Sequence, residues 1–434
     1  MRILVLNQYF YPDRSATSQL LTELCEDLAR HHDVFVVTGR PSYNASTGTG
    51  SKGLVSKELH GRVRVARVWS TAFDRSHMGR RFTNYGTYLA SSVAGALTVS
   101  RPDVVVAFTD PPPVGMIGAL AARLRGVPFV LVTKDIFPDV AVQLGVLRNP
   151  LAIRVSSLMK SALFDSADRV VSIGRDMNER LVEAGVRDEK IVTIHDWSDG
   201  SVVRPLDAGS SMRTKLCWRD RFVVMHSGNV GLSQDLDTVL DAADRLRHEP
   251  AVLFAIVGEG TTKARLERSA EDRELHNVTF LPFQDKADLS ESLGAADVHL
   301  IGLRRGLAGY IVPSKLYGIL AVGKPFIAAV EEGSEPALVA GEHGCGVRVE
   351  PGDADALARA VLEMREADLV GMGKRGREAL VTRFDRPIAA RAYLDLLESV
   401  AETGISDTHG EASTAWGVAH RRIRRRGNAE RTAG

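Results

Sequence analysis

The stretch "RFVVMHSGNVGLSQDLDTVLDAA" at Arg221–Ala243 combines a strand, a glycine-punctuated loop and a helix. Its first residues form a β-branched run without alternation, which favours a strand buried on both faces of a parallel sheet. Gly228 and Gly231 lie in the loop, where glycine lets the backbone approach a ligand. The helix is expected to begin near Gln234–Asp235, and its first N–H groups would attract a phosphate. An ordinary tight turn between strand and helix is the alternative.

The same alternation of strands and helices precedes and follows this stretch. Apolar strand candidates include "RILVLN", "PDVVVAF" and "PFVLVT" before it, and "AVLFAIVGEG", "ADVHLIG" and "KPFIAAV" after it. A polar, turn-rich segment at Asp196–Ser210 separates the two series. We therefore predict two doubly wound α/β domains, at residues 1–200 and 201–383, with a ligand cleft at the carboxyl ends of their sheets.

Length and composition agree with a two-domain globular protein. The chain has 434 residues, above the usual limit of about 250–300 residues for one core. A net charge of +1 points to neither nucleic acid nor membrane, apart from a basic run at His420–Arg426. Cys25, Cys217 and Cys345 are too far apart for a metal motif or a disulfide framework, so we expect a cytoplasmic location. No apolar run approaches the ~20 residues of a membrane span.

The segment "YIVPSKLYGILAVGKP" at Tyr310–Pro325 carries a glycine inside a predicted helix. A glycine there costs about 1 kcal/mol relative to alanine, which suggests close packing or binding. Ser314 could cap this helix, and Leu316 is expected to face inward. Gly318 falls on the opposite side with Lys315 beside it. A sugar or ribose could approach the backbone at Gly318, and a tight helix–helix contact is the alternative.

Two more loops follow strand ends. "FAIVGEGTTKARL" places Gly258 and Gly260 before Lys263, which is either a phosphate clamp or a surface lysine. "VTKDIFPDVAVQLG" holds Asp135 and Asp139; either could orient a hydroxyl, and Asp139 could instead cap the next helix. A metal held by Asp135 and Asp139 is possible, but nothing else nearby supplies a third ligand, so no metal is expected. The sequence also lacks the GxGxxG, Walker A, GxSxG and HExxH motifs.

The order of "NQYFYPD", "KDIFPDVAVQLGVL", "SGNVGLSQDLDTVLDAA", "NVTFLPF" and "VPSKLYGILAVGKPFIA" resembles bacterial glycosyltransferases of the GT-B fold, in the GT4 family. Within it, the chain is similar to UDP-N-acetylfucosamine transferase-like enzymes of O-antigen, capsule and exopolysaccharide synthesis. The resemblance covers about Ile3 to Ser399. It implies two Rossmann-like domains, an N-terminal acceptor domain and a C-terminal nucleotide-sugar domain, with a helix at residues 384–402 crossing back. Residues 403–434 are interpreted as a disordered basic tail.

The resemblance also implies the site. It assigns catalysis to Asp135, Lys134 and Lys315. It places the nucleotide-sugar against Gly228, Asn229, Gly231, Gln234, Gly258, Gly260, Lys263, Phe283, Arg304, Tyr310, Pro313, Ser314, Leu316 and Gly318. Many relatives carry two glutamates eight residues apart where this chain has Tyr310 and Gly318. Many also carry Arg and Lys where it has Asn229 and Gln234, and His where it has Lys134. Lysines and Arg304 or Arg305 are then the available cations.

The expected function is retaining transfer of a sugar from a UDP-sugar to a glycan or polyprenyl-linked acceptor, without a cofactor or metal. The alternatives are a UDP-sugar epimerase of the same architecture and a non-catalytic nucleotide-sugar-binding protein. Nucleic acid is not an expected partner. Peripheral contact with the inner membrane is a separate hypothesis, based on Arg80 and Arg81 in an apolar segment and on Arg421–Arg426. A buried helix and a solvated tail are the alternatives there.

Overall fold

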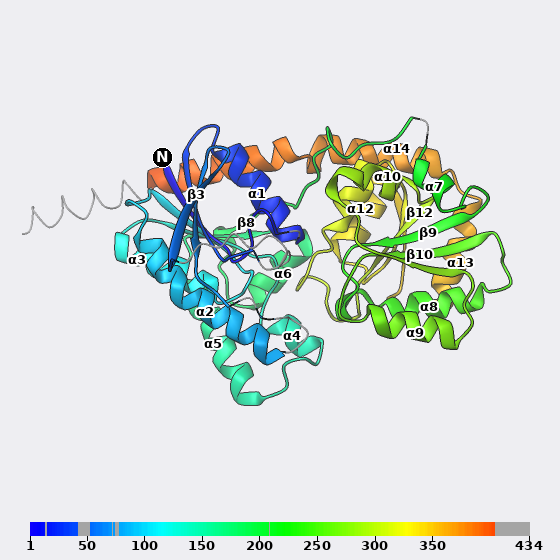
Figure 1. Cartoon of the computed structure of the whole chain (residues 1–434), viewed down its shortest axis with the longest axis horizontal. Helices are drawn as coiled ribbons and strands as arrows, with labels where there is room; N and C mark the ends of the chain where they lie inside the picture. The colour runs from blue at the N-terminus through cyan, green and yellow to red at the C-terminus, as the bar shows by residue number, and fades with distance from the viewer. Residues whose placement is uncertain (14, 42–52, 72, 74–77, 208, 404–434) are drawn as a thin grey trace, which may run out of the picture.

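A computed structural model describes residues 1–13, 15–41, 53–71, 73, 78–207 and 209–403. Two α/β domains lie side by side, and a C-terminal helical segment at residues 369–403, interrupted at Asp385, runs across both (Figure 1). Each domain has a central sheet with helices on both faces, because runs of buried β-branched residues need apolar cover on either side. The predicted fold class, two Rossmann-like doubly wound domains, is confirmed.

The N-terminal domain is built on an eight-stranded sheet in the order β3-β4-β2-β1-β5-β6-β7-β8. Its strands are β1 (Arg2–Leu6), β2 (Asp33–Thr38), β3 (Val55–His60), β4 (Val63–Val68), β5 (Val104–Phe108), β6 (Phe129–Val132), β7 (Arg169–Ser172) and β8 (Ile191–Thr193). All neighbours are parallel except β3 and β4. The sequence did not predict β3, because this edge strand is mostly polar and exposed.

Helices cover both faces of this sheet. They are α1 (Ala16–Leu28), α2 (Met78–Leu97), α3 (Val114–Arg125), α4 (Asp139–Gln143), α5 (Pro150–Ser166) and α6 (Arg175–Glu183), with a 3₁₀ turn at η1 (Asp188–Lys190). The Ser15 hydroxyl caps α1 by accepting the Ser18 N–H. The two faces form separate apolar cores, one under α1 and one under α2, α3 and α5.

The C-terminal domain has a six-stranded parallel sheet in the order β11-β10-β9-β12-β13-β14. Its strands are β9 (Phe222–Ser227), β10 (Val252–Val257), β11 (Val278–Leu281), β12 (Val298–Gly302), β13 (Phe326–Ala329) and β14 (Gly346–Val349). Its helices are α7 (Ser211–Lys215), α8 (Leu236–Arg245), α9 (Lys263–Asp272), α10 (Leu289–Gly294), α11 (Lys315–Ala321), α12 (Glu335–His343), α13 (Ala354–Arg365) and α14 (Leu369–Ala379). Short helical turns lie at η2 (Leu232–Gln234) and η3 (Lys286–Asp288).

The chain returns to the N-terminal domain after α14. A π-helical turn, η4 (Leu380–Phe384), leads into a helix over residues 386–403, which runs along the N-terminal domain in orange (Figure 1). Tyr393 and Leu397 of this helix are buried in the core under α1. The Asp385 carboxylate accepts the Gly200 N–H at 2.9 Å. This hydrogen bond joins the two segments by which the chain passes between the domains, one near Gly200 and one near Asp385. All but the first residue of the predicted tail, 403–434, lies outside the described residues.

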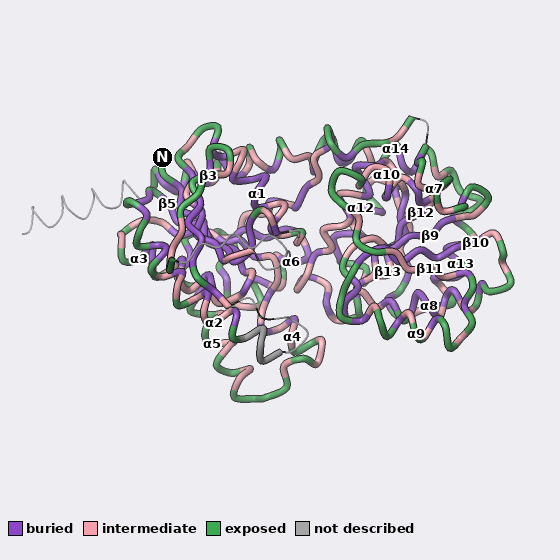
Figure 2. The backbone as a smooth tube through the Cα atoms, in the orientation of Figure 1, coloured by how far each residue is buried: buried purple, intermediate pink, exposed green. Residues whose placement is uncertain are grey.

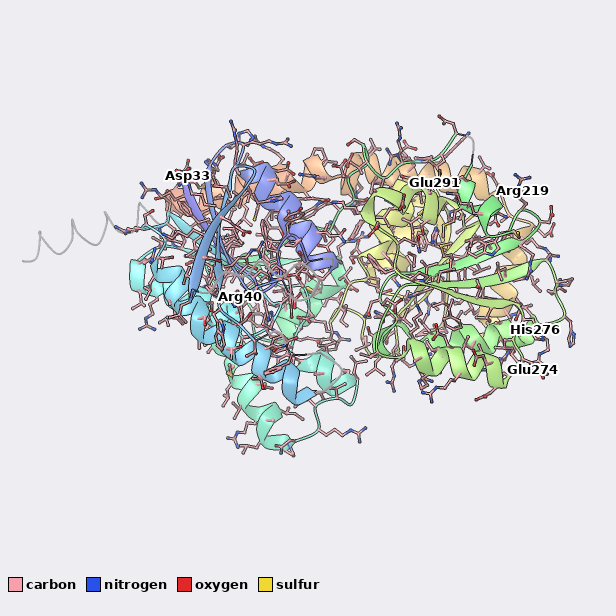
Figure 3. All side chains as sticks on the ribbon, viewed as in Figure 1. Asp33, Arg40, Arg219, Glu274, His276 and Glu291 are labelled. Carbon is pink, nitrogen blue, oxygen red and sulfur yellow. The ribbon has the colours of Figure 1, made fainter. Side chains whose placement is uncertain are left out.

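Burial follows this plan. The central strands of both sheets are buried, whereas α4 and α5 at the base of the N-terminal domain are largely exposed or half-buried (Figure 2). Charged side chains cover the end of the C-terminal domain farthest from its partner, where Arg219, Glu274 and His276 lie (Figure 3). Among the described residues, no helix has both the length and the apolarity needed to cross a bilayer.

Candidate active site

A cavity of 1540 Å³ lies between the two domains, at the carboxyl ends of both sheets. This is the position that the topology of doubly wound sheets predicts for a ligand. Eleven of the residues proposed from the sequence line it: Asp135, Gly228, Asn229, Gly231, Gln234, Gly260, Phe283, Pro313, Ser314, Lys315 and Gly318. The cavity therefore brings the glycine loops of the C-terminal domain opposite the Asp135 loop of the N-terminal domain.

Three proposed residues are held inside the protein. Lys134 pairs its ammonium with the buried carboxylate of Asp196 and does not line the cavity. Leu316 is fully buried in the core of the C-terminal domain, which corrects its assignment to the nucleotide-sugar site. Gly258 supports the loop that carries Gly228 and has no place in the cavity lining.

Three further residues lie at the edges of the site. Lys263 pairs with Glu259 at 2.7 Å and donates to a backbone carbonyl, so it is not a clamp inside the cavity. Arg304 borders a separate small pocket beside α8. Tyr310 packs under the guanidinium of Arg180, 4.8 Å from its ring centre. None of the three lines the cavity, which gives no support to their assignment to the nucleotide-sugar site.

The two glycine loops stack backbone to backbone. A Cβ on Gly258 would lie 1.8 Å from the carbonyl oxygen of Gly228, and a Cβ on Gly260 would lie 2.1 Å from that of Val230. The Val230 N–H donates to the Glu259 carbonyl at 3.0 Å and ties the loops together. Glycine is required at these positions because any side chain would force the loops apart. The second loop therefore shapes the first.

The amide of Gln234 also shapes the loop. Its Oε1 accepts the Gly231 N–H at 3.0 Å. The chain then makes the short η2 turn, and α8 begins at Leu236 after Asp235 adopts a left-handed conformation. The helix therefore begins close to the predicted position. The carboxylate of Asp237 pairs with Arg265 at 2.6 Å instead of facing the cavity.

Lys315 is a cation of the C-terminal half of the cavity, beside the glycine loops. Its Nζ lies 3.2 Å from His226 Nδ1 and 3.1 Å from His226 Nε2, and Nε2 also lies 3.1 Å from the Asn229 carbonyl oxygen. A carbonyl can only accept, so Nε2 carries the proton and Nδ1 accepts from the ammonium. Burial lowers the pKa of Lys315 to about 7, and burial together with Lys315 holds the pKa of His226 well below its usual value.

The lysines of the cavity differ in their partners. Lys160 pairs with Asp139 at 2.6 Å, and Lys286 pairs with Glu23. Lys315 alone of the three cavity-lining lysines contacts a neutral group instead of a carboxylate, in the part of the chain that the structure describes. Because its charge is not offset by an acid, Lys315 is the group best placed to bind an anion. The sequence predicted this lysine but not its histidine partner.

The α11 segment faces the cavity with the side that the sequence predicted. Gly318 lines the cavity while Leu316 and Leu320 are buried behind it. A Cβ on Gly318 would lie 3.4 Å from Leu293 Cδ1, which is ordinary contact, so packing does not demand glycine here. The expected capping by Ser314 is wrong, because its side chain makes no cap hydrogen bond.

The N-terminal domain contributes the Asp135 loop. Thr109 Oγ1 lies 3.2 Å from Asp135 Oδ1, and it accepts the Lys134 N–H at 2.9 Å. Asp135 also makes an antiparallel bridge to Ile311 of the other domain. Asp139, whose role was left open, neither caps α4 nor faces a ligand, because Lys160 holds its carboxylate. Asp135 is therefore the acid of this loop that faces the cleft.

A second contact between the domains was not predicted. The Asp176 carboxylate at the start of α6 accepts the N–H groups of Gly309 and Glu335, at 3.1 and 3.2 Å. Glu335 at the start of α12 in turn accepts the Arg175 N–H at 2.8 Å and pairs with its guanidinium at 3.0 Å. Each helix start is thus capped by an acid of the other domain. We call these three residues, Arg175, Asp176 and Glu335, the interdomain latch.

The charges of the latch are strongly perturbed. Burial, with repulsion from Glu335, raises the pKa of Asp176 to about 6. The pKa of Glu335 falls to about 2, because hydrogen bonds from His195 and Arg175 outweigh its burial. In the sequence, the only sign of these interdomain contacts is an acid close after a glycine or serine at each helix start. Such an acid is explained equally well by local capping of its own helix. The described residues contain no group of three or more metal-ligating side chains.

Comparison with known proteins agrees with this architecture. Residues 16–197 match a glycosyl transferase 4-like domain, and residues 212–378 match glycosyl transferases group 1. The Escherichia coli K12 protein WcaI, a glycosyl transferase assigned to colanic acid biosynthesis, is 31% identical over 377 residues, which span 83% of this chain and 91% of WcaI. The Pseudomonas aeruginosa protein WbjE, named as a glycosyltransferase, is 32% identical over 68% of this chain and 74% of its own.

Solved structures share the fold. Anabaena Alr3699/HepE in complex with UDP and glucose superposes with a TM-score of 0.70 at 18% identity, over 92% of this chain and 100% of that one. Sucrose-phosphate synthase from Thermosynechococcus elongatus gives 0.73 at 16% identity, over 93% and 100%. These structures show the fold alone. The two domain models, which cover both halves of the chain, and the near-full-length match to WcaI show that the chain belongs to the group 1 glycosyltransferase family and is a glycosyltransferase.

Proposed function

We propose that this enzyme transfers a sugar from a UDP-sugar, with retention, to a glycan carried on a polyprenyl or similar lipid. The relatives support polysaccharide biosynthesis as its setting, since WcaI is assigned to colanic acid biosynthesis. HepE, which shares the fold, was solved with UDP and glucose. The resemblance to UDP-N-acetylfucosamine transferase-like enzymes favours an N-acetylated amino or deoxy sugar as the donor. A cytoplasmic location, without a cofactor or metal, belongs to the same proposal.

The observation that carries the proposal is the position of Lys315. Its side chain packs against the Gly228 loop, within 3.6 Å of where a Cβ would stand on that glycine. The diphosphate of a nucleotide-sugar lying along this glycine-lined wall would meet the ammonium of Lys315. That cation replaces the Arg and Lys that many relatives carry where this chain has Asn229 and Gln234. A cation aimed at the departing diphosphate stabilises the charge that develops there.

The two walls of the cavity then have different roles in the reaction. The bond between the sugar's anomeric carbon and the diphosphate oxygen breaks on the Lys315 side. The acceptor hydroxyl attacks the same face of the sugar, and its proton passes to the departing phosphate oxygen, so no separate base is needed. Asp135 and Thr109 lie opposite and would orient the acceptor or a sugar hydroxyl. Holding both partners in one geometry supplies much of the rate enhancement.

The test is the Lys315→Ala variant. We expect turnover with a UDP-sugar to fall by more than about tenfold, the effect of losing one transition-state contact. Lys263→Ala is the matched control, because this lysine lies outside the cavity and should leave turnover unchanged. Wild-type kinetics in Lys315→Ala would contradict the role. NMR of products formed without acceptor separates transfer from epimerisation, since only an epimerase releases a changed UDP-sugar.

A further inference from the structure

The helix α5 is apolar on two opposite sides. Leu163 and Phe164 are buried against the N-terminal core. Leu151, Val155 and Leu158 are 71%, 48% and 64% exposed. Their spacing of four and three residues puts the exposed three on one face of the helix. Nothing in the described part of the chain covers this face, and a soluble surface rarely leaves such a stripe without a partner.

The charged side chains of this region are all basic. Residues 140–164 contain no Asp or Glu, although 54 of the 434 residues are acidic. They include Arg148, Arg154 and Lys160, of which Lys160 is offset by Asp139. Both arginines are exposed, and Arg154 lies on the same helical face as the apolar stripe. Exposed apolar residues flanked by cations, without acids, match the chemistry of an anionic lipid surface.

The same region opens into the active-site cavity. Val146 and Met159 are exposed by 43% and 40%, and both also line the cavity. From there the lining continues through Leu144 and Leu147 to Leu89 on α2. The cavity is thus continuous from the α4–α5 surface to Asp135 and Lys315, and its outer part is lined mainly by apolar side chains.

We propose that the α4–α5 surface, formed by Val146, Leu151, Val155 and Leu158 with Arg148 and Arg154, docks on an anionic lipid bilayer. The apolar outer part of the cavity then receives the lipid chain of a membrane-bound acceptor and leads its glycan to Lys315. This surface projects from the base of the N-terminal domain, where α4 and α5 lie (Figure 1) and where many residues are exposed (Figure 2). The route assigned to the lipid chain of the acceptor rests on the proposed function, whereas the binding of this surface to a bilayer does not.

The experiment is vesicle flotation of the full chain, without donor or acceptor. Vesicles of phosphatidylcholine with phosphatidylglycerol should retain the wild type, and pure phosphatidylcholine should retain less. The double variant Leu151→Glu/Leu158→Glu should lower partitioning by about tenfold or more, because two apolar anchors become acids. Arg148→Glu/Arg154→Glu should act in the same direction. The control Val370→Glu alters a residue that is 70% exposed on α14 and should bind like the wild type.

Three results would overturn the proposal. The first is no flotation of the wild type with anionic vesicles. The second is equal flotation of the Leu151→Glu/Leu158→Glu variant, including binding that is lost only when residues 404–434 are removed. The third is a wild-type dimer that this variant converts to a monomer, which would make the surface an interface between copies. UDP affinity and thermal unfolding should stay unchanged in every variant. If the wild type transfers sugar but does not float with anionic vesicles, the docking surface is refuted and the proposed function is not.

Discussion

At the scale of single residues, the pair of Lys315 and His226 gives donor binding a pH dependence. The buried ammonium has a pKa of about 7 in the unliganded protein, lowered from 10.5 by burial. As pH rises through 7 the unliganded enzyme loses this proton. A bound diphosphate favours the charged form and raises the pKa again. Binding of UDP above pH 7 must therefore take up a proton.

We predict that the Kd for UDP rises between pH 7 and 9, with a slope approaching tenfold per pH unit, the limit for one coupled proton. The terminal phosphate of UDP titrates near 6, below this window. Calorimetry in two buffers of different ionisation enthalpy measures the proton uptake directly. Lys315→Met should remove both the uptake and the slope. A flat Kd across this range in the wild type would show that the ammonium does not meet the diphosphate.

At the scale of elements, the stacked loops at Gly228–Gly231 and Gly258–Gly260 form the wall of the proposed donor site. Two backbones can approach this closely only without Cβ atoms. The hydrogen bonds of Val230 with Glu259 and Thr262 hold the contact. The shape of the wall is thus set by a loop that follows β10, although the ligand would lie against the loop that follows β9.

We expect Gly260→Ala to lower the free energy of unfolding by about 1–3 kcal/mol, as overpacking does, and to weaken UDP binding. The reason is that its Cβ would stand 2.1 Å from the Val230 carbonyl oxygen, and the loops must separate. Chemical denaturation and calorimetry measure the two effects. Gly341→Ala is the matched control, because it lies in α12 with open space around its Cβ. Unchanged UDP affinity in Gly260→Ala would show that this loop does not shape the donor wall.

At the scale of the whole molecule, the interdomain latch holds the two halves of the site together. Asp135 and Lys315 come from different domains, so the proposed transfer depends on the relative position that the latch fixes. Glu335 is fully buried and accepts hydrogen bonds from the backbone N–H and the guanidinium of Arg175. Removing it loses these charge-assisted hydrogen bonds, although Arg175 is partly exposed and keeps its ion pair with Glu342.

The Glu335→Ala variant should therefore be destabilised by about 1–3 kcal/mol and should scatter X-rays as a larger, more open particle. Transfer should slow because the domains are held less firmly in their relative position, whereas UDP affinity should hold, since its proposed contacts lie in one domain. Asp355→Ala, which breaks an exposed pair with Arg245 inside the C-terminal domain, is the control and should leave the particle size unchanged. An unaltered radius of gyration in Glu335→Ala would refute the latch.

The sequence by itself determined the two sheets, the glycine loops after β9 and β10 and the inward face of α11. Each of these depends on local periodicity or on a glycine at a strand end, which neighbouring residues encode. The tertiary structure alone decided which charges face the cleft. Lys134 is paired with Asp196 and Lys315 with His226, partners that lie 62 and 89 residues away in the sequence.

The tertiary structure alone also decided how the domains meet. The latch joins Asp176 to Glu335, and Asp135 bridges to Ile311, across more than a hundred residues in each case. The tertiary structure also buries one apolar face of α5 and leaves the other exposed, although both faces carry apolar residues in the sequence. Local patterns specify which residues avoid water. Only the packing of distant segments decides which charged and apolar side chains find a partner. The reason is that each pairing depends on the residue that lies next to the side chain in space, and not on the side chain alone.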